Sequence, residues 1–200
     1  MHDVIRNSEP CVDQTFAALS VAGSRWEGRV FESCRFLGGD FTQAVFRRCQ
    51  FIDCQFTDCN LSLVAWPASR LQQVRFQGCK LLGVDWTLPA WPSPALAAPI
   101  SLQDCLLDEG NFFGLILPDL VLRGSRLRGA DLREADLRRA DCQGCDLAGA
   151  LFGRTDLREA DFSEAQDYHL NPLENRLQGA RFSRFEALSL LDGLGITLVD

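Results

Sequence analysis

The chain has 200 residues, of which 46% are hydrophobic and 24% charged, a composition typical of a folded domain rather than a disordered chain. Its apolar runs are all shorter than the roughly 20 residues that a membrane-spanning helix needs. The start of the chain lacks a basic-then-apolar signal pattern, so we expect a cytoplasmic protein. The formal net charge is 20 − 27 = −7, which argues against direct binding to nucleic acid or to an anionic membrane.

A large apolar residue recurs at every fifth position along most of the chain. One run extends from Trp26 to Trp86, and a second, shifted by one residue, extends from Leu102 to Phe162 and resumes at Leu177 and Phe182. We call each of these apolar residues the centre of its repeat. Five residues rotate an α-helix by about 500°, and five steps along a flat strand reverse its face. Neither a helix nor a flat strand can therefore keep every centre on one buried side. A chain that bends by about a right angle after every five residues does, since four such segments close a coil of about 20 residues.

The sequence therefore predicts an all-β solenoid, a right-handed quadrilateral β-helix, with the hand expected of parallel crossovers. At a separation of 20 residues the centres form apolar columns such as Phe36–Phe56–Phe76 and Phe46–Trp66–Trp86. Seven of the nine cysteines lie two residues before a centre, where we interpret them as buried packing residues. With only His2 and His169 beside them, they form no recognisable catalytic or metal-binding set. We expect a non-enzymatic protein with no metal and no cofactor.

Two interruptions and a separate C-terminal module complete the expected organisation. We assign residues 1–182 to the solenoid, interrupted by a proline-rich loop at 87–99 and by a break at 166–176. Proline removes ladder donors, so the loop is either a tolerated insertion or a projecting contact loop with Trp91 as its candidate contact residue.

Residues 183–200 are expected to cap the solenoid and to mediate dimerisation. The stretch from Ser183 to Glu186 has the pattern of a helix capping box, and Ile196–Val199 has the pattern of a strand. The module carries more apolar residues than the covering of one coil needs, which favours a homodimer, although a plain intramolecular cap is the alternative. The candidate interface residues are Phe185, Leu188, Leu191, Leu194, Ile196 and Leu198.

The outward positions carry charge in columns, most densely in residues 130–167, where five bases and ten acids give 5 − 10 = −5. Stacking like charges about 5 Å apart costs stability unless solvent or arginine offsets it. A rigid rod with regularly spaced carboxylates has a charge field similar to that of a duplex, and such a rod fits a basic DNA-binding groove on another protein. The alternative is a merely solvated surface. The candidate partner-binding residues of this acidic face are Asp131, Asp136, Asp141, Asp146, Asp156 and Asp161.

The run Ala130-Asp-Leu-Arg-Glu-Ala-Asp-Leu-Arg-Arg-Ala-Asp-Cys-Gln-Gly-Cys-Asp-Leu-Ala-Gly149 resembles the A(D/N)LXX signature of the pentapeptide repeat family, and the resemblance covers roughly residues 11–182. Within that family, the plan of the chain and its segment 180–200 resemble the topoisomerase-poison resistance group. This group includes the Qnr and MfpA proteins, microcin B17 immunity protein and, most similar in plan, the albicidin self-resistance protein AlbG.

The resemblance implies a homodimer through the C-terminal module that mimics DNA. It also implies binding to DNA gyrase, or to topoisomerase IV, and protection of that enzyme from a poison. The competing hypothesis is a protein-interaction scaffold unrelated to topoisomerases.

Overall fold

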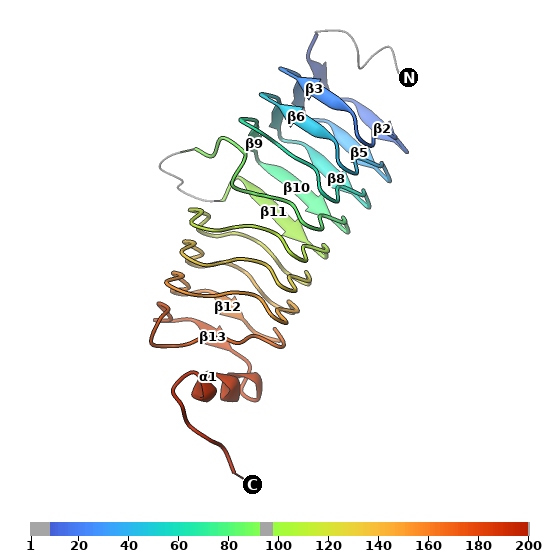
Figure 1. Ribbon diagram of the computed structural model, residues 1–200. Coiled ribbons are helices and arrows are strands. Elements are labelled where there is room, and N and C mark those ends of the chain that lie inside the picture. Colours follow the sequence, from blue (N-terminus) through green and yellow to red (C-terminus); the bar gives the residue numbers. More distant parts are fainter. Residues whose placement is uncertain (1–8, 93–97, 200) are drawn as a thin grey trace.

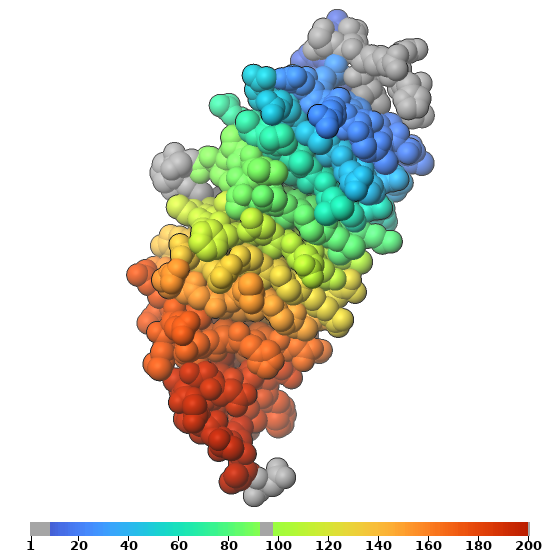
Figure 2. All heavy atoms as spheres, in the orientation of Figure 1, coloured from blue at the N-terminus to red at the C-terminus, as the bar shows by residue number. Residues whose placement is uncertain are grey.

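The computed structural model describes residues 9–92 and 98–199, which form one rod of stacked coils (Figure 1). The chain makes one short strand or β-bridge every five residues, and each pairs in parallel with the residue one coil further along. Four such pairings occur in each coil, so the rod has four walls. The space-filling view shows a continuous column from the first coil to the C-terminal module (Figure 2). The predicted solenoid is confirmed.

The four walls are numbered here in the order in which the chain enters them. The first wall contains β1 (Cys11–Val12), β4 (Val30–Glu32), β7 (Gln50–Ile52) and β9 (Arg70–Gln72), and continues through bridges at Ile116, Asp136, Asp156 and Arg176. The second contains β2 (Thr15–Ala17), β5 (Arg35–Leu37), β8 (Gln55–Thr57), β10 (Val74–Gln77), β11 (Ile100–Gln103), β12 (Asp161–Phe162) and β13 (Arg181–Phe182). The third consists of bridges at Ser20, Asp40, Asn60, Lys80, Leu106, Arg126, Asp146 and Gln166. The fourth contains β3 (Arg25–Glu27) and β6 (Val45–Arg47), with bridges at Ala65, Asp85, Asn111, Asp131 and Leu151.

The core is a stack of apolar rings with the register that the sequence predicts. Phe36 lies opposite Phe56, which lies opposite Phe76. Their ring centroids are 4.5 and 5.1 Å apart, with the planes within 13° of parallel. The Phe46 and Trp66 rings stack in the same way at 5.0 Å. Aromatic stacking in offset or parallel pairs adds stability beyond the burial of area, so these columns hold successive coils in register.

At most corners a left-handed residue two positions after the centre turns the chain. Ser33 has φ +53°, Gln43 +56° and Arg48 +52°, values that side chains other than glycine adopt at a cost. At Gly78 (φ +64°) glycine adopts this conformation without that cost, and a side chain there would displace the carboxylate of Asp58 on the preceding coil. Because this conformation recurs every five residues along most of the chain, the chain has a five-residue structural repeat.

The cysteines two residues before a centre are buried, as expected, but they also form polar bonds between coils. The Cys34 thiol donates to the Cys11 carbonyl at 3.2 Å, and the hydroxyls of Ser69 and Thr155 donate to the carbonyls 23 residues earlier at 2.6 and 2.9 Å. Burial raises the pKa of the Cys54 thiol to about 12, so that thiol remains protonated and able to donate. All nine cysteines are free thiols.

The two interruptions disturb the coils in different ways. Across the proline-rich loop Phe76 pairs with Leu102, a separation of 26 residues, so the loop inserts six residues and shifts the frame by one. The break at 166–176 inserts none, because Asp156 still pairs with Arg176. Within that break Tyr168 and Leu170 are buried and fill the last coil.

The C-terminal module differs from the sequence prediction in two respects. It contains a 3₁₀ helix, η1 (Glu186–Leu188), followed by α1 (Ser189–Asp192). The predicted capping box is wrong, because the Ser183 hydroxyl instead accepts a hydrogen bond from the Glu164 N–H of the last coil at 2.7 Å. The predicted strand at 196–199 is also wrong: these residues pair with no strand of the described chain, and the Ile196 N–H turns back to the Leu191 carbonyl.

A charge placed inside the ring stack should unfold the neighbouring coils. Phe56→Asp would bury a carboxylate between Phe36 and Phe76, at a cost of at least about 3 kcal/mol, because no partner lies within the stack. Phe56→Leu, the matched control, should cost about 1–2 kcal/mol. Thermal melting followed by circular dichroism measures both. Cooperative melting of Phe56→Asp at the wild-type temperature would contradict the register.

Candidate partner-binding surface

The six candidate aspartates all occupy the position just before a centre, but they do not share one face. Asp136 and Asp156 lie on adjacent coils of the first wall, and Asp141 and Asp161 on adjacent coils of the second. Asp146 lies on the third wall and Asp131 on the fourth. The structure therefore brings together the two pairs that a separation of 20 residues predicts and distributes the set around the rod.

Each of the six carboxylates lies within ion-pair distance of an arginine. In three pairs the arginine follows two residues later on the same wall: Asp131–Arg133, Asp136–Arg138 and Asp156–Arg158, at 2.7, 2.7 and 2.6 Å. In the other three the arginine lies on a neighbouring coil: Asp141–Arg123, Asp146–Arg128 and Asp161–Arg181, at 2.7, 2.6 and 3.3 Å. Arginine thus offsets the stacking of like charge that the sequence analysis expected to be costly.

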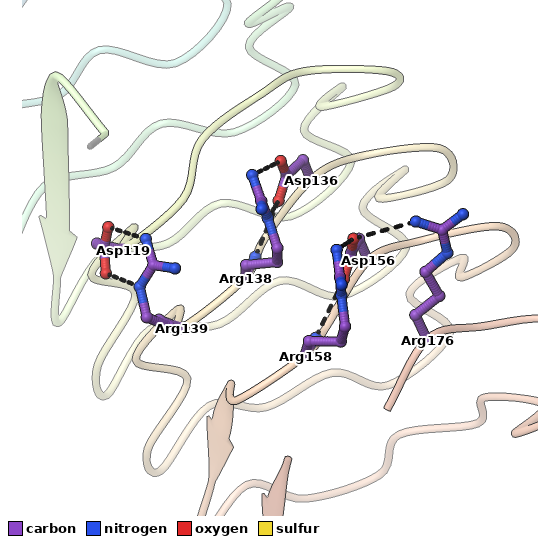
Figure 3. Close-up of polar contacts among 7 residues, drawn as sticks. All are labelled: Asp119, Asp136, Arg138, Arg139, Asp156, Arg158 and Arg176. Atoms are coloured by element: carbon purple, nitrogen blue, oxygen red, sulfur yellow. Dashed lines mark hydrogen bonds and ion pairs between the residues drawn. The ribbon is translucent and has the colours of Figure 1, made fainter. Parts of the chain in front are cut away.

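The first wall shows the pattern most fully (Figure 3). Arg138 and Arg158 each form a bidentate ion pair with the aspartate two residues before them. Arg176 lies on the next coil, 3.5 Å from the carboxylate of Asp156. The Arg158 guanidinium lowers the pKa of Asp156 below its ordinary value, and Arg128 does the same for Asp146. These aspartates are therefore ionised at neutral pH, but each negative charge lies next to a positive one.

The arginine partners of these aspartates were not predicted from the sequence. The sequence shows Arg138 and Arg158 as a basic column, but it does not show that column in contact with the carboxylates. The signal was present in the spacing, since residues i and i+2 of an extended segment lie on the same face, and Asp-x-Arg recurs at this spacing.

The net charge is confined to one half of the rod. Residues 9–92 contain eight basic and eight acidic residues, whereas residues 98–199 contain 11 basic and 17 acidic residues, or 11 − 17 = −6. The two halves of the rod therefore present different net charges to a partner: zero for residues 9–92 and −6 for residues 98–199.

Trp91 does not project from the rod. It packs against the core, and its indole N–H donates to the Trp86 carbonyl at 2.7 Å. The rest of the candidate contact loop includes residues 93–97, which lie outside the described residues. Trp91 thus fixes the base of the loop.

The candidate dimer residues are mostly exposed. The exposed fraction is 82% for Phe185 and lies between 42% and 51% for Leu188, Leu194, Ile196 and Leu198, while Leu191 is half-buried. Leu190 packs against the core and anchors the module to the last coil. The module therefore covers the coil with one side and leaves an apolar surface on the other.

Neither a metal centre nor a membrane-crossing element is apparent in the parts of the chain that the structure describes. No group of three or more His, Cys, Asp and Glu side chains in residues 9–92 and 98–199 could hold a metal ion. No described helix is both long and apolar enough to cross a bilayer. The absence of catalysis stays a prediction.

Sequence comparison identifies the class of protein that this geometry represents. The pattern described as "Pentapeptide repeat region" matches residues 30–112, and "Pentapeptide repeats (8 copies)" matches 105–141, 116–154 and 135–166. Together these matches cover more than half of the chain, and the chain belongs to the pentapeptide repeat family. No curated protein matches the sequence.

Three solved structures define the fold further. Trypsin-treated QnrB1, a plasmid-mediated fluoroquinolone resistance protein, superimposes on 97% of this chain and 100% of its own, with a TM-score of 0.63 and 20% identity. Full-length QnrB1 covers 94% and 100% of the two chains, with a TM-score of 0.61 and 20% identity. HetL, a protein involved in heterocyst differentiation regulation from the cyanobacterium Nostoc sp. strain PCC 7120, covers 90% and 88%, with a TM-score of 0.53 and 19% identity. The resemblance to AlbG stays a prediction.

The ion pairs of the first wall can be tested by titration. Because the pKa of Asp156 is depressed in the fold, the pair's small contribution to stability is present above the unfolded pKa of about 4 and is lost as the pH falls through the folded pKa. Arg158→Gln should raise the pKa of Asp156, measured by carboxyl ¹³C NMR. Arg133→Gln, the control, should raise that of Asp131 and leave Asp156 unchanged. An unaltered Asp156 titration in Arg158→Gln would show that the pair does not form in solution.

Proposed function

We propose that this protein binds DNA gyrase and protects it from a topoisomerase poison, without catalysing a reaction. The observation that carries the proposal is the match to QnrB1 over almost the whole of both chains, since QnrB1 is a fluoroquinolone resistance protein. Two features of this chain support it: one interrupting loop in an otherwise regular rod, and an apolar C-terminal module. Topoisomerase IV, an enzyme of the same class, is the alternative target.

The aspartate columns would supply the contact with the enzyme. On the first and second walls two of these carboxylates lie one coil apart, a rise of about 4.8 Å, against 3.4 Å between phosphates along one DNA strand. The six aspartates are paired with arginines, so a basic groove on gyrase would have to exchange its own arginines and lysines for those of the rod. Exposed ion pairs contribute only about 0–1 kcal/mol each, so this exchange costs little. The resulting contact would mimic DNA through exchangeable pairs.

A supercoiling assay tests the protective function. Gyrase inhibited by a quinolone or by albicidin should regain supercoiling activity when the protein is added in stoichiometric amounts. Asp136→Asn/Asp156→Asn should need about tenfold more protein, because the double variant removes the paired carboxylates of the first wall. Asp13→Asn/Asp53→Asn, which changes the net charge equally in the other half of the rod, should protect as well as the wild type. No binding and no rescue at excess protein would exclude the function.

A second candidate, a protein-interaction scaffold unrelated to topoisomerases, is favoured by one comparison and one structural feature. HetL has the same fold and is involved in differentiation regulation, so the fold serves more than one role. The ion pairs also leave the walls nearly neutral over short distances, which suits contact with an ordinary protein surface. Affinity capture from a cell lysate separates the candidates, since gyrase subunits support the first and another dominant partner supports the second.

We also propose that the protein is a homodimer through residues 183–199. Phe185→Glu should give folded monomers, because Phe185 is 82% exposed and makes little contribution to the fold of its own chain. Leu173→Glu, at a residue 79% exposed but outside the module, is the matched control and should leave the dimer intact. Sedimentation velocity measures both. A wild-type protein that sediments as a monomer would show that the module is only a cap.

A further inference from the structure

The arginines of the two halves of the rod are used differently. Of the 11 arginines in residues 98–199, ten form ion pairs with carboxylates of the chain. Of the seven in residues 9–92, Arg48 alone is ion-paired with another described residue, Glu27. The N-terminal half therefore presents guanidinium groups that the described chain does not neutralise.

Three arginines gather at one corner of the rod, where the chain passes from the fourth wall to the first. The pairings of β3 with β6 and of β7 with β9 place Arg47 and Arg48 at the end of the fourth wall and Arg70 at the start of the first wall on the next coil, all exposed. Arg25 pairs with Val45 at the other edge of the fourth wall. We call Arg47, Arg48 and Arg70 the arginine corner. Among the described residues, the carboxylate that opposes this set is Glu27, which is ion-paired with Arg48. Asp85, further along the fourth wall, is already hydrogen-bonded to Thr87 and Asn111.

The surface beside these arginines is low and partly apolar. In the third coil the outward positions of the fourth wall are Ala65, Pro67 and Ala68, whose short side chains form a shallow floor next to the guanidinium groups. The base of the proline-rich loop borders that floor, because the Ala68 N–H donates to the Leu88 carbonyl at 3.0 Å. Figure 1 shows the loop leaving the rod beside β9. Leu88 is 40% exposed there, and the half-buried Trp91 lies three residues further on.

We propose that the arginine corner binds a carboxylate-rich segment of a protein partner. Arginine recognises carboxylates through two parallel N–H···O bonds, and Arg47 and Arg70 offer free guanidinium groups on either side of the floor. Leu88 and Trp91 would pack against apolar residues of the same segment, since arginine and tryptophan are enriched at the centres of protein interfaces. The proposal goes beyond the protective function and does not depend on gyrase being the partner.

The same observations favour a protein over a nucleic acid. The corner carries three arginines, whereas the other half of the same rod carries a net charge of −6, which would repel a duplex running along it. Single-stranded nucleic acid is bound by rows of exposed aromatic side chains, whereas Trp26 and Trp91, the half-buried aromatic residues described beside the corner, both pack against the core. A short acidic segment meets the corner without reaching the acidic half.

The test uses the full chain and a fluorescent synthetic peptide of alternating Glu and Leu, with a Gln-for-Glu peptide and a short DNA duplex as comparison probes. Arg47→Glu/Arg70→Glu should weaken binding of the acidic peptide about tenfold at low salt. Arg35→Glu/Arg75→Glu is the matched control: it reverses two exposed arginines of the second wall, also without ion-pair partners among the described residues, with the same change in net charge of 2 × −2 = −4. This control should weaken binding no more than about twofold. Leu88→Ser should weaken binding several-fold without altering its salt dependence.

Three outcomes would overturn the proposal. If the wild-type chain binds the acidic peptide no more tightly than the Gln peptide, the corner is not a carboxylate site. Equal losses in the two double variants would show that only the overall charge matters. Tighter binding of the duplex than of the acidic peptide would assign the corner to phosphates. Each result leaves the gyrase assay unaffected, so failure of this proposal is distinguishable from failure of the protective function.

Discussion

The structure depends on a hydrogen bond made by the residue that turns each corner. That residue has a left-handed backbone, which costs roughly 1–2 kcal/mol where it is not glycine. Its own N–H compensates by crossing to the next coil: Ser33 donates to Ile52, Gln43 to Ser62 and Arg48 to Pro67, at 2.9, 2.9 and 3.0 Å. The strained turn and the bond between coils therefore form together. A coil without a neighbour would keep the strain and lose the bond, so the rod is stable only as a stack.

Because the coils stack, like charges on the outer surface lie close together and must be compensated. A repeat that places an aspartate before each centre also places aspartates directly above one another on successive coils. The C-terminal half meets this condition by pairing each candidate aspartate with an arginine, either two residues along or one coil away. The N-terminal half has a net charge of zero, with most of its arginines free of ion pairs among the described residues. Two kinds of recognition surface thus arise on one scaffold: exchangeable ion pairs in one half and free guanidinium groups in the other.

Much of this architecture could be predicted from the sequence because a four-sided solenoid is the simple structure that buries an apolar residue at every fifth position. The columns of Phe36, Phe56 and Phe76 have the expected register, and the frame shift after Trp86 corresponds to an insertion of six residues. The repeat also predicted that Asp136 would lie over Asp156.

The features that were not predicted depend on the direction of long side chains and on the choice between alternative hydrogen-bond partners. The carboxylates were expected to form an acidic face whose like charges solvent or arginine could offset. A long arginine side chain can reach back two residues or across one coil, and periodicity does not reveal which. The Ser183 hydroxyl had two acceptable partners, and the N–H of Glu164 on the neighbouring coil supplied the bond instead of the helix. Ile196–Val199 has the composition of a strand, but no strand in the described part of its own chain pairs with it. The thiols, expected to act only by packing, also donate to carbonyls because the coil above lies within reach.

Nuclear Overhauser contacts between the core aromatic rings, measured on uniformly labelled protein, test the central claim most directly. A stack of coils requires contacts from Phe36 to Phe56 and from Phe56 to Phe76, at separations of 20 residues, and from Phe76 to Leu102 at 26. Contacts confined to separations of three or four residues, as in a helix, or between antiparallel neighbours, as in a sandwich, would contradict it.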